Sequence, residues 1–143
     1  MTVATILKRK GSRVVTVRPD TTVAAIAETL VRERIGAAVV ADSEGGIAGI
    51  VSERDIVVGL ARRGAAVLEE RAETIMTKKV VTCTPEQRVD ELMATMTEGR
   101  FRHLPVVAQG RLAGIVSIGD VVKSRLEALE AEAGALRSYI ASG

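Results

Sequence analysis

A seven-residue segment that occurs twice is the strongest constraint on the fold of this 143-residue chain. Gly49–Asp55 reads Gly-Ile-Val-Ser-Glu-Arg-Asp, and 65 residues later Gly114–Asp120 reads Gly-Ile-Val-Ser-Ile-Gly-Asp. Each copy predicts a short apolar strand, a turn at the serine and a new helix. A serine and an aspartate three residues apart form a capping box, in which both side chains satisfy backbone N–H groups at the helix N-terminus. Capping is the simplest role for one such motif, but two copies indicate a duplication that can build two related sites.

The surroundings of the motif repeat in the same order. The segment Val14–Val17 returns 66 residues later as Val80–Cys83, and Pro19 returns as Pro85. One residue is lost at the turn Gln109-Gly110, so the offset falls to 65 before the second motif. This order predicts two copies of one unit, strand–helix–strand–strand–helix. The apolar positions of the first helix also recur, Val23, Ile26, Ala27 and Leu30 as Val89, Leu92, Met93 and Met96.

The predicted strands cover 14–17, 37–41 and 47–51 in the first unit, and 80–83, 104–108 and 112–117 in the second. A helix begins after Thr22 and is expected to end at Gly36, and another begins at Ser52. Both helices should cover one face of each sheet and the sister repeat the other. We therefore predict an α/β (α+β) fold, with two tandem β-α-β-β-α repeats related by a pseudo-two-fold. The predicted boundaries are 1–73 for the first repeat with its N-terminal segment and linker, 74–124 for the second, and 125–143 for a C-terminal helix and tail.

Composition limits the classes of function. The hydrophobic fraction of 47% is enough for a globular core, but the only aromatic residues are Phe101 and Tyr139, which disfavours base stacking. The net charge is +2 and the charges are interspersed, so nucleic-acid binding is not expected. We interpret Lys8–Lys10 as a solvated loop, with a phosphate contact as the alternative. A single cysteine suits a reducing cytoplasm, and no signal peptide or membrane span of ~20 apolar residues is apparent.

No catalytic signature is present. The chain lacks a Walker A loop, a GxGxxG sequence and a zinc-ligand cluster, so neither an enzyme nor a metal site is predicted. Cys83 and His103 as a nucleophile–base pair would lack a third, orienting group, and Cys83 is better explained as a small core residue. His103 is either a surface residue at a strand end or a phosphate contact. Pro105 inside a strand indicates an edge position or a bulge.

The last helix carries a seam of apolar residues spaced 4, 3, 4, 3 and 4 apart. The seam is shorter than the ~3–4 heptads typical of a coiled coil, and Gly134 weakens it by roughly 1 kcal/mol relative to alanine. Two alternatives stay open, packing on its own domain and docking on a second subunit. The seam residues are Val122, Leu126, Leu129, Ala133, Leu136 and Ile140.

Taken together, these features resemble a tandem pair of CBS domains, or Bateman module, of the stand-alone bacterial type. The likeness covers nearly the whole chain. It rests on the order and double occurrence of short fragments. They are Val-Val-Thr-x-x-Pro at 14–19 and 80–85, the segments 35–40 and 102–107, and the two Gly-Ile-Val-Ser-x-x-Asp motifs.

The resemblance implies a regulatory module that senses adenosine nucleotides, AMP, ADP or ATP foremost and NAD(H) or S-adenosylmethionine possible, with no obligatory cofactor. It also implies a homodimer and a regulated protein of unknown identity. The motif aspartate would accept the ribose hydroxyls, since an ionised carboxylate is acceptor-only. The motif serine, the helix N-terminus and nearby basic residues would hold phosphates.

Carried over from the family, each cleft combines the first two strands of one repeat with the Ser-x-x-Asp turn of the other. Only the second cleft brings arginines and a histidine near the phosphates, so we expect it to hold phosphates better. The alternatives are a ligand-free structural or protein-interaction module, a small enzyme and a nucleic-acid-binding protein. The first site joins Thr16, Val17, Gly36 and Ala37 to Ser117 and Asp120. The second joins Thr82, Cys83, Arg102, His103 and Pro105 to Ser52, Arg54 and Asp55.

Overall fold

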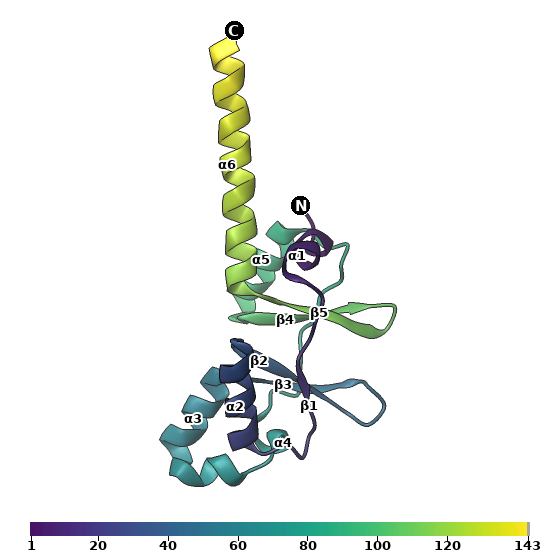
Figure 1. Cartoon of the computed structure of the whole chain (residues 1–143), viewed down its shortest axis with the longest axis vertical. Coiled ribbons are helices and arrows are strands. Elements are labelled where there is room, and N and C mark those ends of the chain that lie inside the picture. Colours follow the sequence, from purple (N-terminus) through teal and green to yellow (C-terminus); the bar gives the residue numbers. More distant parts are fainter. Residues whose placement is uncertain (143) are drawn as a thin grey trace. The chain divides into compact units, whose positions relative to one another are not determined.

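The computed structural model describes residues 1–142, which form two compact units of mixed α and β structure (Figure 1). The central unit comprises Arg13–Val81 and Gln109–Ala113. The terminal unit comprises Met1–Ser12, Thr82–Ala108 and the chain from Gly114 onward. The α+β prediction is confirmed. The sequence boundaries at 73/74 and 124/125 remain predictions about the repeats, because the compact units are not continuous in sequence.

The central unit is built on a three-stranded sheet in the order β1-β2-β3. β1 (Thr16–Val17) is parallel to β2 (Ala37–Ala41), and β2 is antiparallel to β3 (Ile47–Ser52). The helices are α2 (Val23–Glu33), α3 (Glu53–Arg63) and α4 (Ala72–Ile75). A 3-10 helix covers Gly64–Glu69, within residues 64–73 that the sequence predicts as the linker. The core joins alternate strand residues to the predicted apolar face of α2, and its members include Val17, Val23, Ile26, Leu30, Ala38, Val40, Val51 and Ile56.

Local interactions fix both ends of α2. The Thr22 hydroxyl accepts a hydrogen bond from the Ala25 N–H at 3.2 Å, as expected of an N-cap. The prediction that Gly36 ends the helix is wrong. Arg34 is the C-cap instead, in the left-handed conformation with φ 56°, and its N–H bonds to carbonyls of the preceding turn.

The terminal unit contains α1 (Val3–Lys10), α5 (Val89–Gly99), β4 (His103–Ala108), β5 (Arg111–Ser117, from Gly114 onward in this unit) and α6 (Ile118–Ser142). β4 and β5 form a two-stranded sheet. The predicted strand at 80–83 is reduced to one parallel bridge, Cys83 with Val106. Pro105 explains the difference. Its counterpart Val39 donates its N–H to a neighbouring carbonyl at 3.4 Å, whereas proline has no N–H to donate.

The basic run at 8–10 is the last turn of α1, so its interpretation as a solvated loop is wrong. α1 is tied to the segment before α5 by backbone hydrogen bonds. The Val3 N–H donates to the Gln87 carbonyl at 2.9 Å and the Ala4 N–H to the Pro85 carbonyl at 2.9 Å. The N-terminal segment therefore packs within the unit that holds the second Ser-x-x-Asp motif.

Each motif begins with a glycine because another segment of the same unit packs on it. A Cβ at Gly114 would lie 2.7 Å from Leu7 Cδ2, and a Cβ at Gly49 would lie 2.7 Å from Met76 Sδ. Leu7 and Met76 occupy matching places in the segments Thr5-Ile6-Leu7 and Thr74-Ile75-Met76. The glycine is thus a packing requirement, which the motif alone did not reveal.

Candidate functional site

The turn from β3 into α3 is a complete capping box. Asp55 Oδ2 accepts hydrogen bonds from the Ser52 N–H at 2.8 Å and from the Ser52 hydroxyl at 3.0 Å. In return, the Asp55 N–H donates to Ser52 Oγ at 3.3 Å. The predicted cap is confirmed. Within residues 1–142 no donor reaches the second carboxylate oxygen, Oδ1, so this atom remains available to a ligand.

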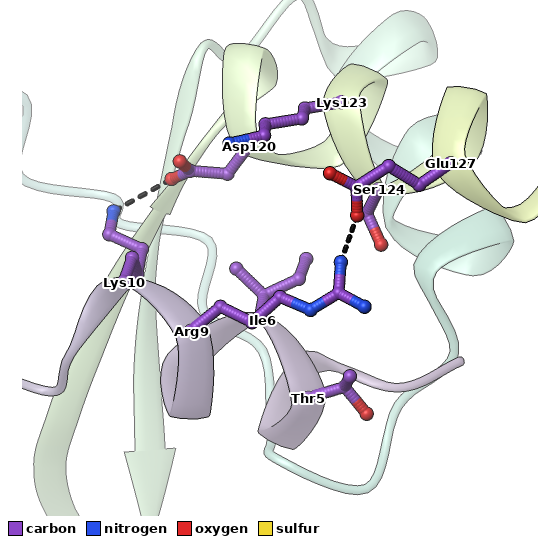
Figure 2. Close-up of a pocket in the computed structure, with 8 residues that line it drawn as sticks. All are labelled: Thr5, Ile6, Arg9, Lys10, Asp120, Lys123, Ser124 and Glu127. Carbon is purple, nitrogen blue, oxygen red and sulfur yellow. Dashed lines mark hydrogen bonds and ion pairs between the residues drawn. The ribbon is translucent and has the colours of Figure 1, made fainter.

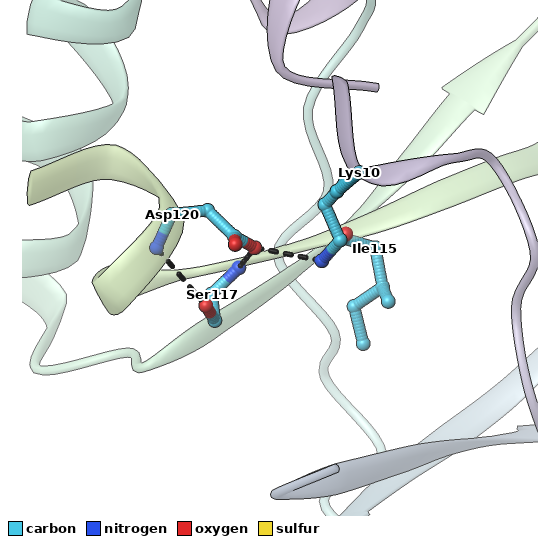
Figure 3. Close-up of polar contacts among 4 residues, drawn as sticks. All are labelled: Lys10, Ile115, Ser117 and Asp120. Carbon is cyan, nitrogen blue, oxygen red and sulfur yellow. Dashed lines mark hydrogen bonds and ion pairs between the residues drawn. The ribbon is translucent and has the colours of Figure 1, made fainter. Parts of the chain in front are cut away.

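The turn from β5 into α6 has both reciprocal backbone bonds of the capping box and one additional partner (Figure 3). Asp120 Oδ2 accepts from the Ser117 N–H at 2.9 Å, and the Asp120 N–H donates to Ser117 Oγ at 3.2 Å. The Lys10 ammonium then donates to Asp120 Oδ2 at 2.7 Å and to the Ile115 carbonyl at 2.9 Å. This half of a predicted site therefore has a fixed cation, contrary to the expectation that it would have none.

Lys10 also changes the acidity of Asp120. Partial burial would raise the pKa of this carboxyl, but the Lys10 hydrogen bond, the Ser117 backbone bond and the Lys10 charge together outweigh burial. The pKa of Asp120 is therefore lowered from its ordinary value of 3.8. The carboxylate is ionised at neutral pH, as an acceptor of ribose hydroxyls must be.

A shallow pocket lies beside this ion pair, between α1 and the first turns of α6 (Figure 2). Arg9 forms an ion pair with Glu127 across it. The sequence shows the basic run, but not that its partners lie more than 100 residues further along the chain. The pocket is lined by Thr5, Ile6, Arg9, Lys10, Asp120, Lys123, Ser124 and Glu127.

In each unit, the residue before the second strand lies beside the Ser-x-x-Asp turn of the same unit. In the central unit, the Glu53 N–H donates to the Gly36 carbonyl at 2.9 Å, and Ala37 pairs with Ser52 in the sheet. In the terminal unit, the Ile118 N–H donates to the Arg102 carbonyl at 2.8 Å. The predicted clefts combine residues of both units, so their assembly remains a prediction.

The remaining predicted site residues differ in burial. Val17, Ala37, Cys83 and Pro105 are buried, while His103 is half-buried. Thr16, Thr82, Arg54 and Arg102 are exposed and accessible to a ligand.

Cys83 is part of the core rather than a nucleophile. It is 3% exposed, and burial raises the pKa of its thiol to about 11. The thiol is therefore neutral at physiological pH, which disfavours covalent catalysis. Across residues 1–142 no group of three or more His, Cys, Asp or Glu side chains forms a metal-ion site. None of the helices formed by these residues is long and apolar enough to cross a membrane.

The sequence profile of the CBS domain matches residues 3–62 and again 72–127. The chain is a tandem CBS-domain protein. The crystal structure of a CBS-domain-containing protein from Agrobacterium tumefaciens is similar to this CBS pair, with 51% sequence identity and a TM-score of 0.85. The similarity covers 87% of this chain and 99% of that chain. The family resemblance predicted from the sequence is thereby confirmed.

Two further solved CBS structures contain adenosine derivatives. A CBS-domain protein from Pyrobaculum aerophilum is complexed with AMP. It is 28% identical, with a TM-score of 0.75, over 84% of this chain and 89% of that chain. The CBS pair of protein MJ0100 is complexed with 5-methylthioadenosine and S-adenosyl-L-methionine. It is 27% identical, with a TM-score of 0.78, over 91% of this chain and 98% of that chain.

Proposed function

We propose that this CBS pair is a regulatory module that binds an adenosine nucleotide, foremost AMP, ADP or ATP. NAD(H) and S-adenosylmethionine are the alternative ligands. The observation that carries the proposal is the duplicated Ser-x-x-Asp turn. In both copies one carboxylate oxygen caps the helix and the other has no donor within residues 1–142. The adenosine ligands of solved relatives support the same class of ligand.

The chemistry of the turn fits a nucleotide. The vicinal ribose hydroxyls are two donors, and an ionised aspartate offers only acceptors. The helix N-terminus beside it carries a partial positive charge that favours phosphate. Arg54, Arg102 and His103 are the phosphate contacts we assign to the second site, as the sequence predicted.

Lys10 gives the first site a cation of its own. In the structure its ammonium donates to Asp120 and to the Ile115 carbonyl. An ammonium has three donors on a flexible stem, so it can turn toward a phosphate while the ribose takes its place at Asp120. We therefore assign Lys10 to the first site together with Thr16, Val17, Gly36, Ala37, Ser117 and Asp120.

Regulation follows from a ligand that contacts both repeats. Such a ligand stabilises one mutual orientation of the repeats and so changes the surface available to a regulated protein. Competition between AMP and ATP for one cleft would make the module a sensor of energy state. The proposal includes a homodimer without enzymatic activity, and a cytoplasmic location.

Thermal unfolding with AMP, ADP, ATP, NAD, NADH and S-adenosylmethionine tests the proposal. A ligand at ~100 times its Kd should add about 2.7 kcal/mol to the free energy of unfolding. We expect a rise in Tm with one adenosine ligand, and loss of that rise in Asp55→Ala or Asp120→Ala, each compared with its own ligand-free Tm. The variant that loses the rise identifies the occupied site.

Asp90→Ala is the matched control, because Asp90 also lies in the first turn of a helix but outside both motifs. It should keep the full ligand response. If no ligand raises Tm in the unaltered protein, the nucleotide proposal is wrong and the ligand-free interaction module takes its place. Nucleotide hydrolysis that disappears in Asp55→Ala would instead indicate an enzyme.

A further inference from the structure

The C-terminal helix has an apolar surface that its own unit does not cover. α6 packs against α1 and α5 and buries Val121 and Ser124 near its start. Its C-terminal half extends past both of these helices (Figure 1). The apolar seam is exposed along its whole length, from 41% at Val122 to 67% at Ile140. The alternative that this seam packs on its own domain is therefore wrong.

The seam and the buried residues lie on different faces of α6. At about 100° per residue, the centre of the seam is rotated about a third of a turn from Val121 and Ser124. The terminal unit thus occupies one face of the helix and leaves the other face open. The 4-3-4-3-4 spacing is that of the a and d positions of a coiled coil, with Leu126, Ala133 and Ile140 at a.

Charged residues flank the seam in a pattern that selects one partner. Arg125 and Glu132 occupy g positions, and Glu130 and Arg137 occupy e positions. In a parallel, in-register pair each g residue faces the e residue five positions later on the other helix. Arg125 then faces Glu130 of the second copy, and Glu132 faces Arg137 of the second copy. Two-fold symmetry makes four attractive pairs.

The antiparallel arrangement produces the opposite result. With the a and d layers aligned around the seam centre, e faces e and g faces g. Glu130 then faces Glu130 of the second copy, and Glu132 faces Glu132 of the second copy. Lys123 faces Arg137 of the second copy. Every fully charged pair is repulsive, so the charges disfavour this orientation.

These charges have no role within the chain that would explain their order. Within residues 1–142 none of Arg125, Glu130, Glu132 and Arg137 forms an ion pair. None has an opposite charge three or four residues away along α6. We propose that the exposed seam of α6 binds a second copy of this chain as a parallel, in-register two-stranded coiled coil.

The seam is short, and its length sets the strength of the association. Val122 to Ile140 spans roughly 27 Å, below the ~3–4 heptads of an independent coiled coil. Ala133 also fills its a position poorly. The dimer therefore dissociates on dilution, within a concentration range that sedimentation equilibrium can follow.

Sedimentation equilibrium on the full chain tests the seam and its orientation. Leu129→Glu places a charge in an exposed d position and should leave a folded monomer, with folding checked by circular dichroism. Arg137→Glu places a second negative charge opposite Glu132 on both sides of the parallel dimer. It should weaken dimerisation about tenfold. Glu132→Lys combined with Arg137→Glu restores opposite charges and should restore the affinity.

The outcomes of these experiments distinguish the parallel pair from the antiparallel pair. An antiparallel pair would be tightened by Arg137→Glu, because this change places opposite charges across from Lys123. That result overturns the proposal, as does a protein that is monomeric at all concentrations or whose dimer is unmoved by both variants. Leu129→Cys gives a second measurement. This variant should form a disulfide-linked dimer on oxidation, because position 129 of one copy lies beside position 129 of the other only in the parallel, in-register pair. The unaltered protein, whose Cys83 is buried, should not form one.

Discussion

The two Ser-x-x-Asp turns are built alike and differ in what a segment outside the motif brings to them. The carbonyl of Ile50 accepts a backbone hydrogen bond from Thr77 at 2.9 Å. The carbonyl of its counterpart, Ile115, accepts the Lys10 ammonium at 2.9 Å. The equivalent carbonyl oxygen therefore accepts a backbone N–H in one unit and a lysine ammonium in the other.

This difference teaches how a duplicated fold acquires unequal sites. The strand, the cap and the helix start are reproduced because they depend on short motifs. The charge beside the aspartate comes from a segment outside the motif, where Lys10 is paired with Asp120 and Lys79, its counterpart 69 residues later, is exposed and has no ion pair within residues 1–142. Two equal turns thus present one aspartate with a cation and one without.

The largest expected difference between the two turns concerns their glycines. A Cβ in Gly49→Ala would lie 2.8 Å from the Thr77 carbonyl oxygen, a backbone atom that cannot move aside. In Gly114→Ala the nearest atoms belong to the flexible end of Leu7. We expect Gly49→Ala to lower the free energy of unfolding by about 1–3 kcal/mol and Gly114→Ala by clearly less, measured by urea denaturation. Equal losses would show that Leu7 is as immobile as the Thr77 backbone.

A double-mutant cycle measures the coupling free energy between Lys10 and Asp120 directly. Lys10 and Asp120 are 33% and 26% exposed, so their coupling should be at most about 1 kcal/mol. The variants are Lys10→Ala, Asp120→Ala and their combination, each followed by chemical denaturation. The matched cycle with Lys79→Ala and Asp55→Ala should give a coupling near zero. A similar coupling in both cycles would contradict the asymmetry.

Acid titration sharpens the same comparison. The pKa of Asp120 in the folded protein lies below its ordinary value of 3.8, so its stabilising contribution is present above that value. The contribution is lost as the pH falls through the lowered folded pKa, because the unfolded chain binds the proton more readily. Asp120→Asn should therefore destabilise the protein at neutral pH, and the difference from the unaltered protein should shrink below about pH 4. A difference that is constant with pH would exclude this linkage.

The smallest effect is expected where the first strands of the two repeats are compared. Cys83 takes the place that Val17 has in the first repeat, and both are buried. Cys83→Val should change the free energy of unfolding by less than about 1 kcal/mol. Because the thiol has a pKa of about 11, the native protein should react with a thiol reagent at pH 8 far more slowly than the unfolded chain. Rapid reaction of the native protein would show that this strand opens readily.

The sequence predicts the features that depend on short motifs and on hydrophobic periodicity. The apolar face of α2, the hairpin of β2 and β3 and both capping boxes follow from residues close in the chain. The sequence also predicts that Pro105 is unusual within a strand, but not that the segment at 80–83, which is distant in sequence, loses its strand pairing as a result.

The features that sequence reasoning missed depend on contacts between distant segments. Lys10 and Asp120 are 110 residues apart, and no periodicity connects them. The end of α2 at Arg34 depends on a left-handed conformation that arginine seldom adopts, so residue propensities favour Gly36 instead. The cross-repeat assembly of Thr16, Thr82 and the other predicted site residues stays a prediction.

The discontinuous make-up of the terminal unit has a consequence for biosynthesis. α1 is made first, yet its backbone partners are Pro85 and Gln87 and its side-chain partners lie at 114–127. Arg13–Val81, the bulk of the central unit, is synthesised before all of these residues and well before 114–127. Val3 and Ile6, which are buried in the folded protein, therefore remain exposed to solvent while the middle of the chain folds. The N-terminal helix is the first part synthesised and one of the last to find its place.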